Sequence, residues 1–227
     1  MTTSDTLRRF LEGQFQAWTL PDSEQTHARP RPVIAITREL GCGAEHIAQA
    51  LAQDLGLALY DGEMIEEITK DVHVSAHVVA TLDEKVRPEL DAWLASLYGG
   101  PDMTSNQYMK GLRSVLYTIS AHGNAIIVGR GANFLIPAEK KTIGLCFVAP
   151  LEARVKNIMQ EHRLSSTEAR ERIARIECER RRWVKEMCFA DIDDVTNYHL
   201  VMNTSLVASE TIVQIVKEIV RVKTFRE

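Results

Sequence analysis

The stretch Val33-Ile34-Ala35-Ile36-Thr37-Arg38-Glu39-Leu40-Gly41-Cys42-Gly43-Ala44-Glu45-His46-Ile47 decides the fold of this chain. It begins with a short apolar run, passes through a loop that contains two glycines, and continues with apolar residues at helical spacing. Gly56 stands where that helix would end. A strand, a glycine loop and a helix in this order can direct backbone N–H groups and a helix N-terminus at a phosphate. We therefore predict either a phosphate-binding loop over residues 41–46 or an ordinary turn between a strand and a helix.

The loop differs from the Walker A sequence G-x-x-x-x-G-K-[ST]. This chain has Arg38 at the position of the first Walker glycine and Ala44 at the position of the lysine. Because that lysine supplies positive charge, we expect Arg38 or another arginine to replace it if the loop binds phosphate. His46 either donates a hydrogen bond to the phosphate or has no role there.

The composition is that of an ordinary globular protein. The chain has 227 residues, 45% of them hydrophobic and 26% charged, with a net charge of −4. This size suits one large domain with insertions, and the slightly acidic balance argues against a broad nucleic-acid surface. The apolar runs are shorter than the ~20 residues that span a bilayer, and the N-terminus does not resemble a secretory signal. We therefore predict a cytoplasmic protein whose partners are neither nucleic acids nor membranes.

The cysteines are scattered without metal-binding spacing, at Cys42, Cys146, Cys178 and Cys188. Reduced thiols explain them better than disulfides or zinc, and we predict no metal held by side chains. Cys42 lies in the glycine loop, where a helix N-terminus can lower the pKa of a thiol. The alternative is a small residue that fills space in a tight loop.

Short apolar runs alternate with helical patterns along the chain, at residues 33–36, 57–60, 125–128, 143–148 and 200–202. This alternation predicts a doubly wound α/β fold with a short, mostly parallel, five-stranded sheet. Ligands gather at the C-terminal ends of the strands in such a fold. Those ends carry residues 38–45, Asp61, Arg130 and Asn203.

Residues 1–30 are expected to form a segment apart from the α/β domain at residues 31–227. Residues 4–18 place apolar side chains on one helical face, and a stretch with Pro21, Pro30 and Pro32 follows. We predict an amphipathic helix and a linker. The helix packs either on its own domain or against a second copy, so a homodimer through this helix is one alternative.

Arg130 and Asp61 are the candidates for holding a substrate. Arg130 follows a fully apolar strand and lies between two glycines, which suits bidentate capture of a phosphate. Its alternative is a structural ion pair with a carboxylate such as Glu39 or Asp61. Asp61 follows another predicted strand, and it either contacts a substrate or a magnesium-bound water, or caps the next helix.

Residues 170–185 are rich in arginine and include Arg175 and Arg180. Ser165 and Glu168 have the spacing of a capping box that begins a long helix through this segment. The charges either form a solvated helix face with ion pairs four residues apart, or belong to a closing lid. The arginines of such a lid would neutralise a phosphoryl group in transfer, and the lid would exclude water.

Several of these segments resemble the motifs of the cytidylate-kinase-like family, a branch of the P-loop nucleoside-monophosphate kinases. The matching segments follow in order over roughly residues 31–222: Ile36-Thr37-Arg38-Glu39-Leu40-Gly41-Cys42-Gly43, Ile47-Ala48, Leu55-Gly56, Tyr60-Asp61, Val128-Gly129-Arg130-Gly131-Ala132-Asn133, Ala149-Pro150-Leu151-Glu152-Ala153-Arg154, Glu177-x-x-Arg180-x-x-Trp183 and Tyr198-x-Leu200-Val201-Met202-Asn203-Thr204. The branch commonly lacks the Walker lysine, as this chain does. The chain departs from it by placing Glu45 where phosphates should lie, and Glu177 and His199 where an aspartate is usual.

The resemblance implies a three-layer P-loop kinase-like fold, with a helical acceptor-binding insertion near residues 61–122 and a helical lid near 163–190. It implies transfer of the γ-phosphoryl group of ATP to a nucleoside monophosphate, CMP or dCMP by default, with Mg²⁺ bound through the nucleotide. The donor phosphates would then be held by Arg38, Gly41, Cys42, Gly43, Ala44, Glu45 and His46. Arg130 and Asp61 would hold the acceptor, and the catalytic side chains would be Arg130, Arg175 and Arg180.

Two other functions stay open at this point. The missing lysine and Glu45 favour a nucleotide-binding regulatory protein that keeps the fold without turnover. The arginines of residues 170–185 and Arg130 favour an enzyme, because a binding module does not need a clamp for the transition state. That enzyme could also be a kinase for a different small phosphorylatable metabolite.

Overall fold

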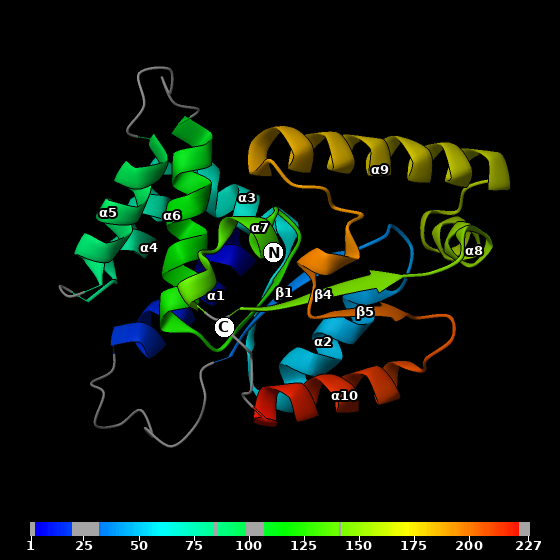
Figure 1. The fold of residues 1–227 in the computed structure, drawn as a ribbon, viewed down its shortest axis with the longest axis horizontal. Coiled ribbons are helices and arrows are strands. Elements are labelled where there is room, and N and C mark those ends of the chain that lie inside the picture. Colours follow the sequence, from blue (N-terminus) through cyan, green and yellow to red (C-terminus); the bar gives the residue numbers. More distant parts are fainter. Residues whose placement is uncertain (1–2, 20–31, 84–85, 99–106, 141, 223–227) are drawn as a thin grey trace. The chain divides into compact units, whose positions relative to one another are not determined.

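The computed structural model of this chain describes residues 3–19, 32–83, 86–98, 107–140 and 142–222. The chain forms two compact units (Figure 1). One unit combines Met1–Arg31 with Asp61–Gly123, and the other combines Pro32–Tyr60 with Asn124–Glu227. The first is built from helices, and the second is an α/β unit that carries the glycine loop and the arginine-rich segment.

A five-stranded parallel sheet forms the centre of the α/β unit (Figure 1). Its strands are β1 (Val33–Arg38), β2 (Ala58–Tyr60), β3 (Ala125–Val128), β4 (Ile143–Val148) and β5 (Leu200–Asn203). They lie in the order β2-β3-β1-β4-β5, and every neighbouring pair is parallel. In the centre, Ala35 of β1 lies opposite Ile127 of β3 and Gly144 of β4. The predicted short sheet is confirmed, and its strand pairs are all parallel.

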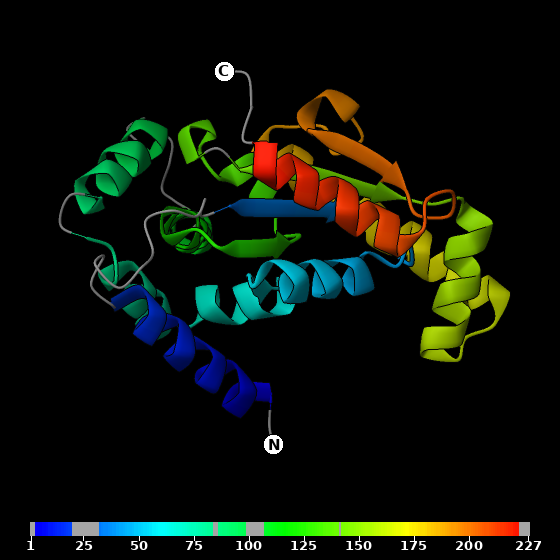
Figure 2. The ribbon, with the colours of Figure 1, turned by 90° about the horizontal axis from the view of Figure 1, so that it is seen from below.

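Helices α2 (Ala44–Leu55) and α10 (Ser209–Val222) pack together on one face of the sheet. Figure 2 shows this side, with α10 lying across the strands. Alternate strand residues such as Ile34 and Ile36 are buried in the same apolar cluster as Leu51 and Val216. The period of two along the strand and of three to four along the helix brings these side chains together. This cluster fixes α2, and with it the loop that precedes α2.

The arginine-rich segment of this unit is one long helix. The chain continues after β3 through α7 (Ala132–Leu135) and the 3₁₀ turn η1 (Ala138–Lys140) into β4. After β4 come α8 (Leu151–His162), α9 (Ser166–Cys188) and the 3₁₀ turn η2 (Val195–Asn197). The predicted capping box at Ser165 and Glu168 is confirmed and begins α9.

The helical unit contains five helices within its described residues: α1 (Thr3–Thr19), α3 (Gly62–Lys70), α4 (Val72–Ala80), α5 (Arg87–Tyr98) and α6 (Gln107–His122). Helix α6 contacts α3, α4 and α5, and buries Leu112 and Leu116 completely. Asp61 caps α3 and Asp71 caps α4 through their side-chain oxygens. The carboxylates satisfy N–H groups that have no partner within their helices.

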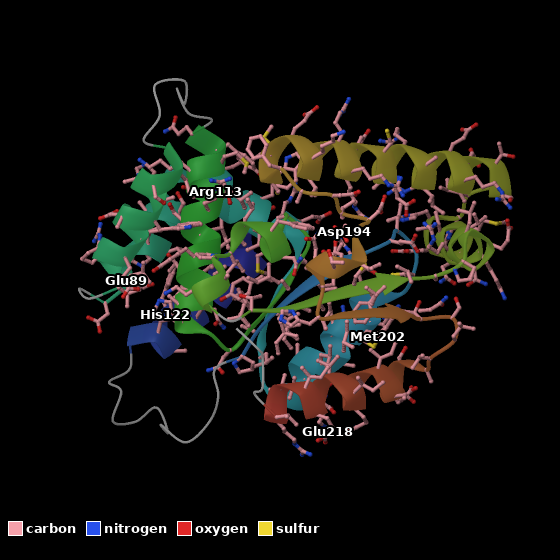
Figure 3. The ribbon with its side chains drawn as sticks, viewed as in Figure 1. Glu89, Arg113, His122, Asp194, Met202 and Glu218 are labelled. Atoms are coloured by element: carbon pink, nitrogen blue, oxygen red, sulfur yellow. The ribbon has the colours of Figure 1, made fainter. Side chains whose placement is uncertain are left out.

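Aromatic side chains of the N-terminal helix α1 pack against helices α4 and α6. Trp18 stacks on His122 of α6 with ring centroids 4.3 Å apart, and Phe15 meets the edge of His77 of α4 at 4.4 Å. His122 lies at the end of α6 (Figure 3). These contacts match the alternative in which the helix packs on its own chain. The homodimer stays a prediction, and the predicted linker at residues 20–31 lies outside the described residues.

Within the described part of the chain, no helix is both long and apolar enough to cross a bilayer.

Candidate functional site

The loop between β1 and α2 turns sharply at two glycines. Gly41 and Gly43 have φ angles of 82° and 81°, in the left-handed region that favours glycine. A Cβ on Gly41 would lie 2.8 Å from the carbonyl oxygen of Arg154, so α8 approaches too closely for a larger residue. Gly43 caps α2, and no side chain of the described residues accepts a hydrogen bond there. The first-turn N–H groups of α2 therefore present the positive end of the helix dipole to the loop.

Side chains from α8 and from the segment after β5 hold two carbonyl oxygens of the loop. Asn157 Nδ2 donates to the carbonyl of Gly41 at 2.8 Å, and Thr204 Oγ1 donates to the carbonyl of Cys42 at 2.7 Å. The C=O and the N–H of a trans peptide point in opposite directions. The N–H of Cys42, which follows the Gly41 carbonyl, donates to the carbonyl of Glu39 at 3.4 Å. The N–H of Gly43, which follows the Cys42 carbonyl, points away from Thr204.

Arg38 ends β1 and places positive charge beside Glu45 at the start of α2. Its Nε is 3.4 Å from Oε1 of Glu45, and a Cβ on Gly129 would lie 2.7 Å from its Nη1. The Arg38 side chain is 17% exposed and that of Glu45 is 56% exposed. Ala44 and Glu45 occupy the positions of the Walker lysine and hydroxyl residue. Glu45 therefore forms an ion pair with Arg38, the arginine that we expect to bind phosphate in place of the Walker lysine.

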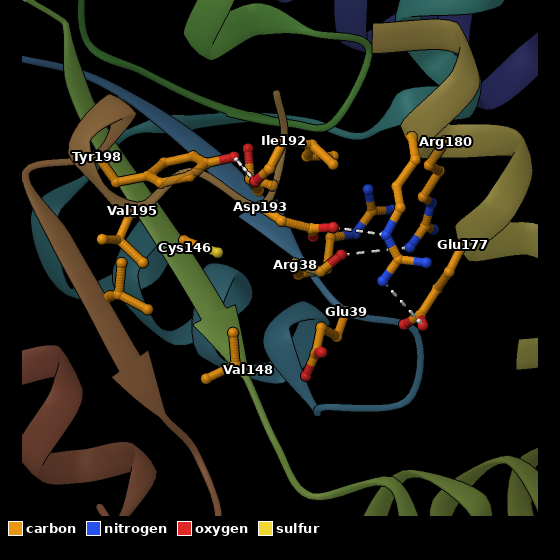
Figure 4. Close-up of a pocket in the computed structure, with 13 residues that line it drawn as sticks. Arg38, Glu39, Cys146, Val148, Glu177, Arg180, Ile192, Asp193, Val195 and Tyr198 are labelled. Carbon is orange, nitrogen blue, oxygen red and sulfur yellow. Dashed lines mark hydrogen bonds and ion pairs between the residues drawn. The ribbon is translucent and has the colours of Figure 1, made fainter. Parts of the chain in front are cut away.

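Arg180 of α9 reaches the same corner of the unit (Figure 4). Its Nη1 donates to the backbone carbonyl of Arg38 at 3.3 Å. Burial, and after it the charge of Arg38, lowers the pKa of Arg180 to about 10, although Glu45 and Glu177 act in the opposite direction. The guanidinium remains charged at neutral pH. A bound anion would offset both its burial and its repulsion from Arg38.

A pocket opens beside these two arginines and has a charged side and an apolar side (Figure 4). Its charged lining residues are three arginines and three carboxylates, Arg38, Arg180, Arg181, Glu39, Glu177 and Asp193, and its apolar lining includes Cys146, Val148, Val195 and Val201. Tyr198 also lines the pocket, donates to the carbonyl of Ile192 at 2.7 Å, and has its pKa raised by burial. The pocket therefore places arginines, together with carboxylates that partly balance them, next to an apolar wall.

Arg154 of α8 is a buried arginine that sequence reasoning left without a role. Its Nη1 lies 2.5 Å from Glu177 Oε1, its Nε lies 3.4 Å from Glu39 Oε2, and the residue is 6% exposed. The sequence does carry a signal, because Leu151, Val155 and Ile158 form a helical stripe that includes position 154. An arginine inside an apolar stripe indicates a buried ion pair.

Arg130 lies in a loop with three consecutive positive φ angles, at Gly129, Arg130 and Gly131. On one side of the loop is the guanidinium of Arg38, against Gly129. On the other is α9, since a Cβ on Gly131 would lie 2.8 Å from Trp183. The two glycines therefore allow close approach as well as positive φ. The roles of Arg130 in acceptor binding and catalysis stay predictions.

Arg175 lies apart from this pocket. Its Nη1 is 3.4 Å from Oε1 of Glu179, and the two side chains are 60% and 54% exposed. This is the surface ion pair, four residues apart, that the alternative for this segment predicts. Helix α9 thus has one solvated face, which carries Arg175, and one face that lines the pocket, which carries Arg180. The catalytic role of Arg175 stays a prediction.

The structure also gives local contacts for three other predicted site residues, Asp61, Cys42 and His46. Asp61 Oδ1 accepts a hydrogen bond from the N–H of Met64 at 2.8 Å, so it caps α3, and substrate binding by it stays a prediction. Burial raises the pKa of Cys42 to about 11, although the N–H of Ala44 acts in the opposite direction. A protonated, buried thiol fits the small-residue alternative for Cys42. His46 is exposed on the first turn of α2.

Comparisons of the sequence and the structure with known proteins show which family the chain is similar to. A model of the cytidylate kinase-like family matches residues 33–206. The cytidylate kinase of Pyrococcus horikoshii is 24% identical over 186 residues, covering 82% of this chain and 86% of its own. The cytidylate kinase of Ignicoccus hospitalis is 25% identical over 188 residues, covering 82% of this chain and 96% of its own. An uncharacterised protein of Eubacterium ventriosum has a similar crystal structure, with a TM-score of 0.66 at 18% identity over 86% of this chain and 100% of that chain.

Proposed function

Because the chain belongs to the cytidylate kinase-like family, we propose that it transfers the γ-phosphoryl group of ATP to a nucleoside monophosphate. The family supports phosphoryl transfer to a nucleotide or another small molecule in general. CMP and dCMP are the first acceptors to test, because the two relatives compared above are named cytidylate kinases.

The observation that carries the proposal is the pair of guanidinium groups, Arg38 and Arg180, beside the N-terminus of α2. Phosphoryl transfer depends on positioning and on positive charge around the group in transfer, with little covalent work by the protein. Burial, and after it the charge of Arg38, lowers the pKa of Arg180, and a bound phosphate would offset both effects. Two arginines thus supply the charge that a Walker lysine would supply.

The residues at this corner fit a nucleotide polyphosphate. The N–H groups at the start of α2 and the Arg38 guanidinium would hold the donor phosphates, once Arg38 exchanges Glu45 for a phosphate oxygen. Mg²⁺ would be held through the nucleotide and would neutralise part of the phosphate charge. Arg180 would contact the group in transfer from α9, and α9 would limit the access of water.

The acceptor phosphate is assigned to Arg130. A guanidinium at the end of an interior strand, between two glycines that permit close approach, suits bidentate binding of a phosphate. Asp61 remains a candidate acceptor contact from the family resemblance alone.

A nucleotide-binding protein without turnover is the second candidate, and Glu45 favours it. Its carboxylate is 3.4 Å from Arg38 and would repel a phosphate in the loop. The kinase proposal requires that nucleotide binding overcome this pair. The binding-protein proposal requires only that some nucleotide bind nearby.

The test is ADP release from ATP–Mg²⁺ across a panel of nucleoside monophosphates and other small phosphorylatable metabolites. Turnover with CMP or dCMP at about 1–100 per second would support the proposal. Turnover with a different metabolite alone would keep the reaction and replace the acceptor. No turnover, with ATP still raising the melting temperature, would favour the binding protein.

The variant Arg130→Ala should abolish turnover while circular dichroism shows a folded protein. Lys156→Ala, on the exposed side of α8, is the matched control and should retain the wild-type rate. Full activity of Arg130→Ala would remove the acceptor assignment.

A further inference from the structure

We propose that Glu177 is a positioning residue, which fastens α9 to the start of the glycine loop so that Arg180 is held at the phosphate site. The inference rests on the proposed function, because it needs the phosphate site at Arg38 and Arg180. It adds a residue that lines the same pocket and acts by setting where Arg180 lies.

The hydrogen bonds of Glu177 lead to the strand–loop junction. Its Oε1 accepts from the N–H of Leu40 at 3.3 Å and from Arg154 Nη1 at 2.5 Å. Leu40 directly precedes the first glycine of the loop. Arg154 also donates to the carbonyl of Leu40 at 3.5 Å and to that of Ala149 at 2.9 Å. One carboxylate and one guanidinium thus hold both polar groups of the Leu40 backbone.

The environment makes this connection rigid. The side chains of Arg154 and Glu177 are 8% and 12% exposed, so water screens their attraction weakly. Glu39 completes the cluster, with Oε2 3.4 Å from Arg154 Nε and accepting from the N–H of Ala149 at 2.8 Å. Arg154 therefore lies between two carboxylates, one from the strand–loop junction and one from α9. Removing Glu177 leaves the buried Arg154 with Glu39 alone, at 3.4 Å, and removing Arg154 leaves Glu177 without its closest cation.

The link to Arg180 follows from helix geometry. Residues three apart on a helix lie on the same face, so Glu177 and Arg180 point the same way from α9. Glu177 binds Leu40, and Arg180 donates to the carbonyl of Arg38, two residues earlier. Helix α9 is thus attached at two successive points to the stretch 38–40. The contact of Glu177 with Leu40 therefore sets how far Arg180 lies from the carbonyl of Arg38.

The neighbouring Arg181 does not share this dependence. Its Nε donates to Asp193 Oδ2 at 2.6 Å, which holds it from another segment, and it lies 3.9 Å from Glu177 Oε2. Arg180 donates to a backbone carbonyl instead. Its placement therefore relies on where α9 lies.

The test is a double-mutant cycle on the dissociation constant of ATP–Mg²⁺, measured by calorimetry with the full chain. The variants are Glu177→Gln, Arg180→Gln and the double variant. Glutamine still accepts from Leu40 but no longer balances the charge of Arg154. We expect Glu177→Gln to weaken binding about 10-fold in the wild-type background and less than about 3-fold in the Arg180→Gln background, because residues that act through one another are not additive.

Two further variants separate positioning from a general loss of structure. Glu179→Gln removes an exposed carboxylate two positions away on the same helix and should change binding less than about 2-fold. Glu177→Asp keeps the charge but shortens the side chain, so it should lose less affinity than Glu177→Gln. It also replaces that variant in the cycle if Glu177→Gln does not fold.

Equal losses from Glu177→Gln in both backgrounds would overturn the inference, since a merely structural role would weaken binding whether or not Arg180 is present. Failure of the wild-type protein to bind ATP–Mg²⁺ would overturn the proposed function and this inference together. Binding by the wild-type protein with additive losses would overturn this inference alone.

Discussion

Two ion pairs of α9 have the same length and different surroundings. Arg170 and Glu152 are 2.5 Å apart, with side chains 42% and 75% exposed. Arg154 and Glu177 are also 2.5 Å apart, but their side chains are 8% and 12% exposed. An exposed pair competes with water and salt, whereas a buried pair cannot lose one member without leaving an unbalanced charge. Distance alone therefore does not tell which pair the protein depends on.

The same contrast separates the two arginines predicted to be catalytic. Arg175 and Arg180 are five residues apart, which turns their side chains about 140° from each other around a helix. Arg175 is 60% exposed and bound to Glu179, while Arg180 lines the pocket beside Arg38. One helix thus combines a solvated face with a face that belongs to the site.

The largest expected effect comes from breaking the buried pair with Arg154→Met. Glu177 and Glu39 would then lose the guanidinium between them. We expect a loss of about 3–5 kcal/mol in the free energy of unfolding, and therefore a melting temperature lower by on the order of 10 °C in a unit of this size. Differential scanning calorimetry measures it.

The control for that variant is Lys156→Met on the same helix, where the side chain is exposed. It should leave the melting temperature within about 1 °C of the wild-type value. Equal losses from the two substitutions would show that the buried pair has no special importance.

A smaller effect is expected on activity from the two faces of α9. Arg180→Gln should lower kcat/KM about 100-fold, because it removes charge aimed at the group in transfer. Arg175→Gln should lower kcat/KM by about 10-fold or less, because Arg175 faces solvent. Steady-state kinetics on the best acceptor of the panel gives both values. A larger loss from Arg175→Gln would mean that α9 presents its other face during turnover.

The smallest effect is expected from Arg170→Gln at the exposed pair. The hydrogen bond and charge of Arg170 lower the pKa of Glu152. The variant should raise that pKa towards its ordinary value, which NMR titration of the Glu152 carboxyl group measures. The attraction is present above the ordinary glutamate pKa and is lost as pH falls through the lowered one, so the melting temperature at neutral pH should change by about 1 °C or less. A large drop would remove the distinction between the pairs.

The sequence predicted the elements of the fold because their signals are local. The apolar runs at 33–36 and 125–128 became interior strands, and Gly56 ends α2 in the left-handed conformation as expected. The cap at Ser165 was equally visible, since its partner is three residues away. In each case the residue types and their spacing in the sequence were sufficient to predict the element.

The site was harder to predict because its contacts are not local. Leu40 and Glu177 are 137 residues apart in the chain, and no periodicity links them. The arginine-rich segment fitted two hypotheses, since helical spacing shows which residues share a face but not which face is buried. The family resemblance named Arg154 and Glu177 as motif positions, and only the folded chain shows that they bind each other.

The measurement that tests the central claim most directly is a crystal structure with ADP and Mg²⁺ bound. If Arg38 and Arg180 supply the charge of the missing Walker lysine, the Arg38 guanidinium will have left Glu45 for a phosphate oxygen. The phosphates will then lie against the N-terminus of α2, within reach of Arg180. Nucleotide phosphates bound elsewhere, with Arg38 still paired to Glu45, would contradict the account.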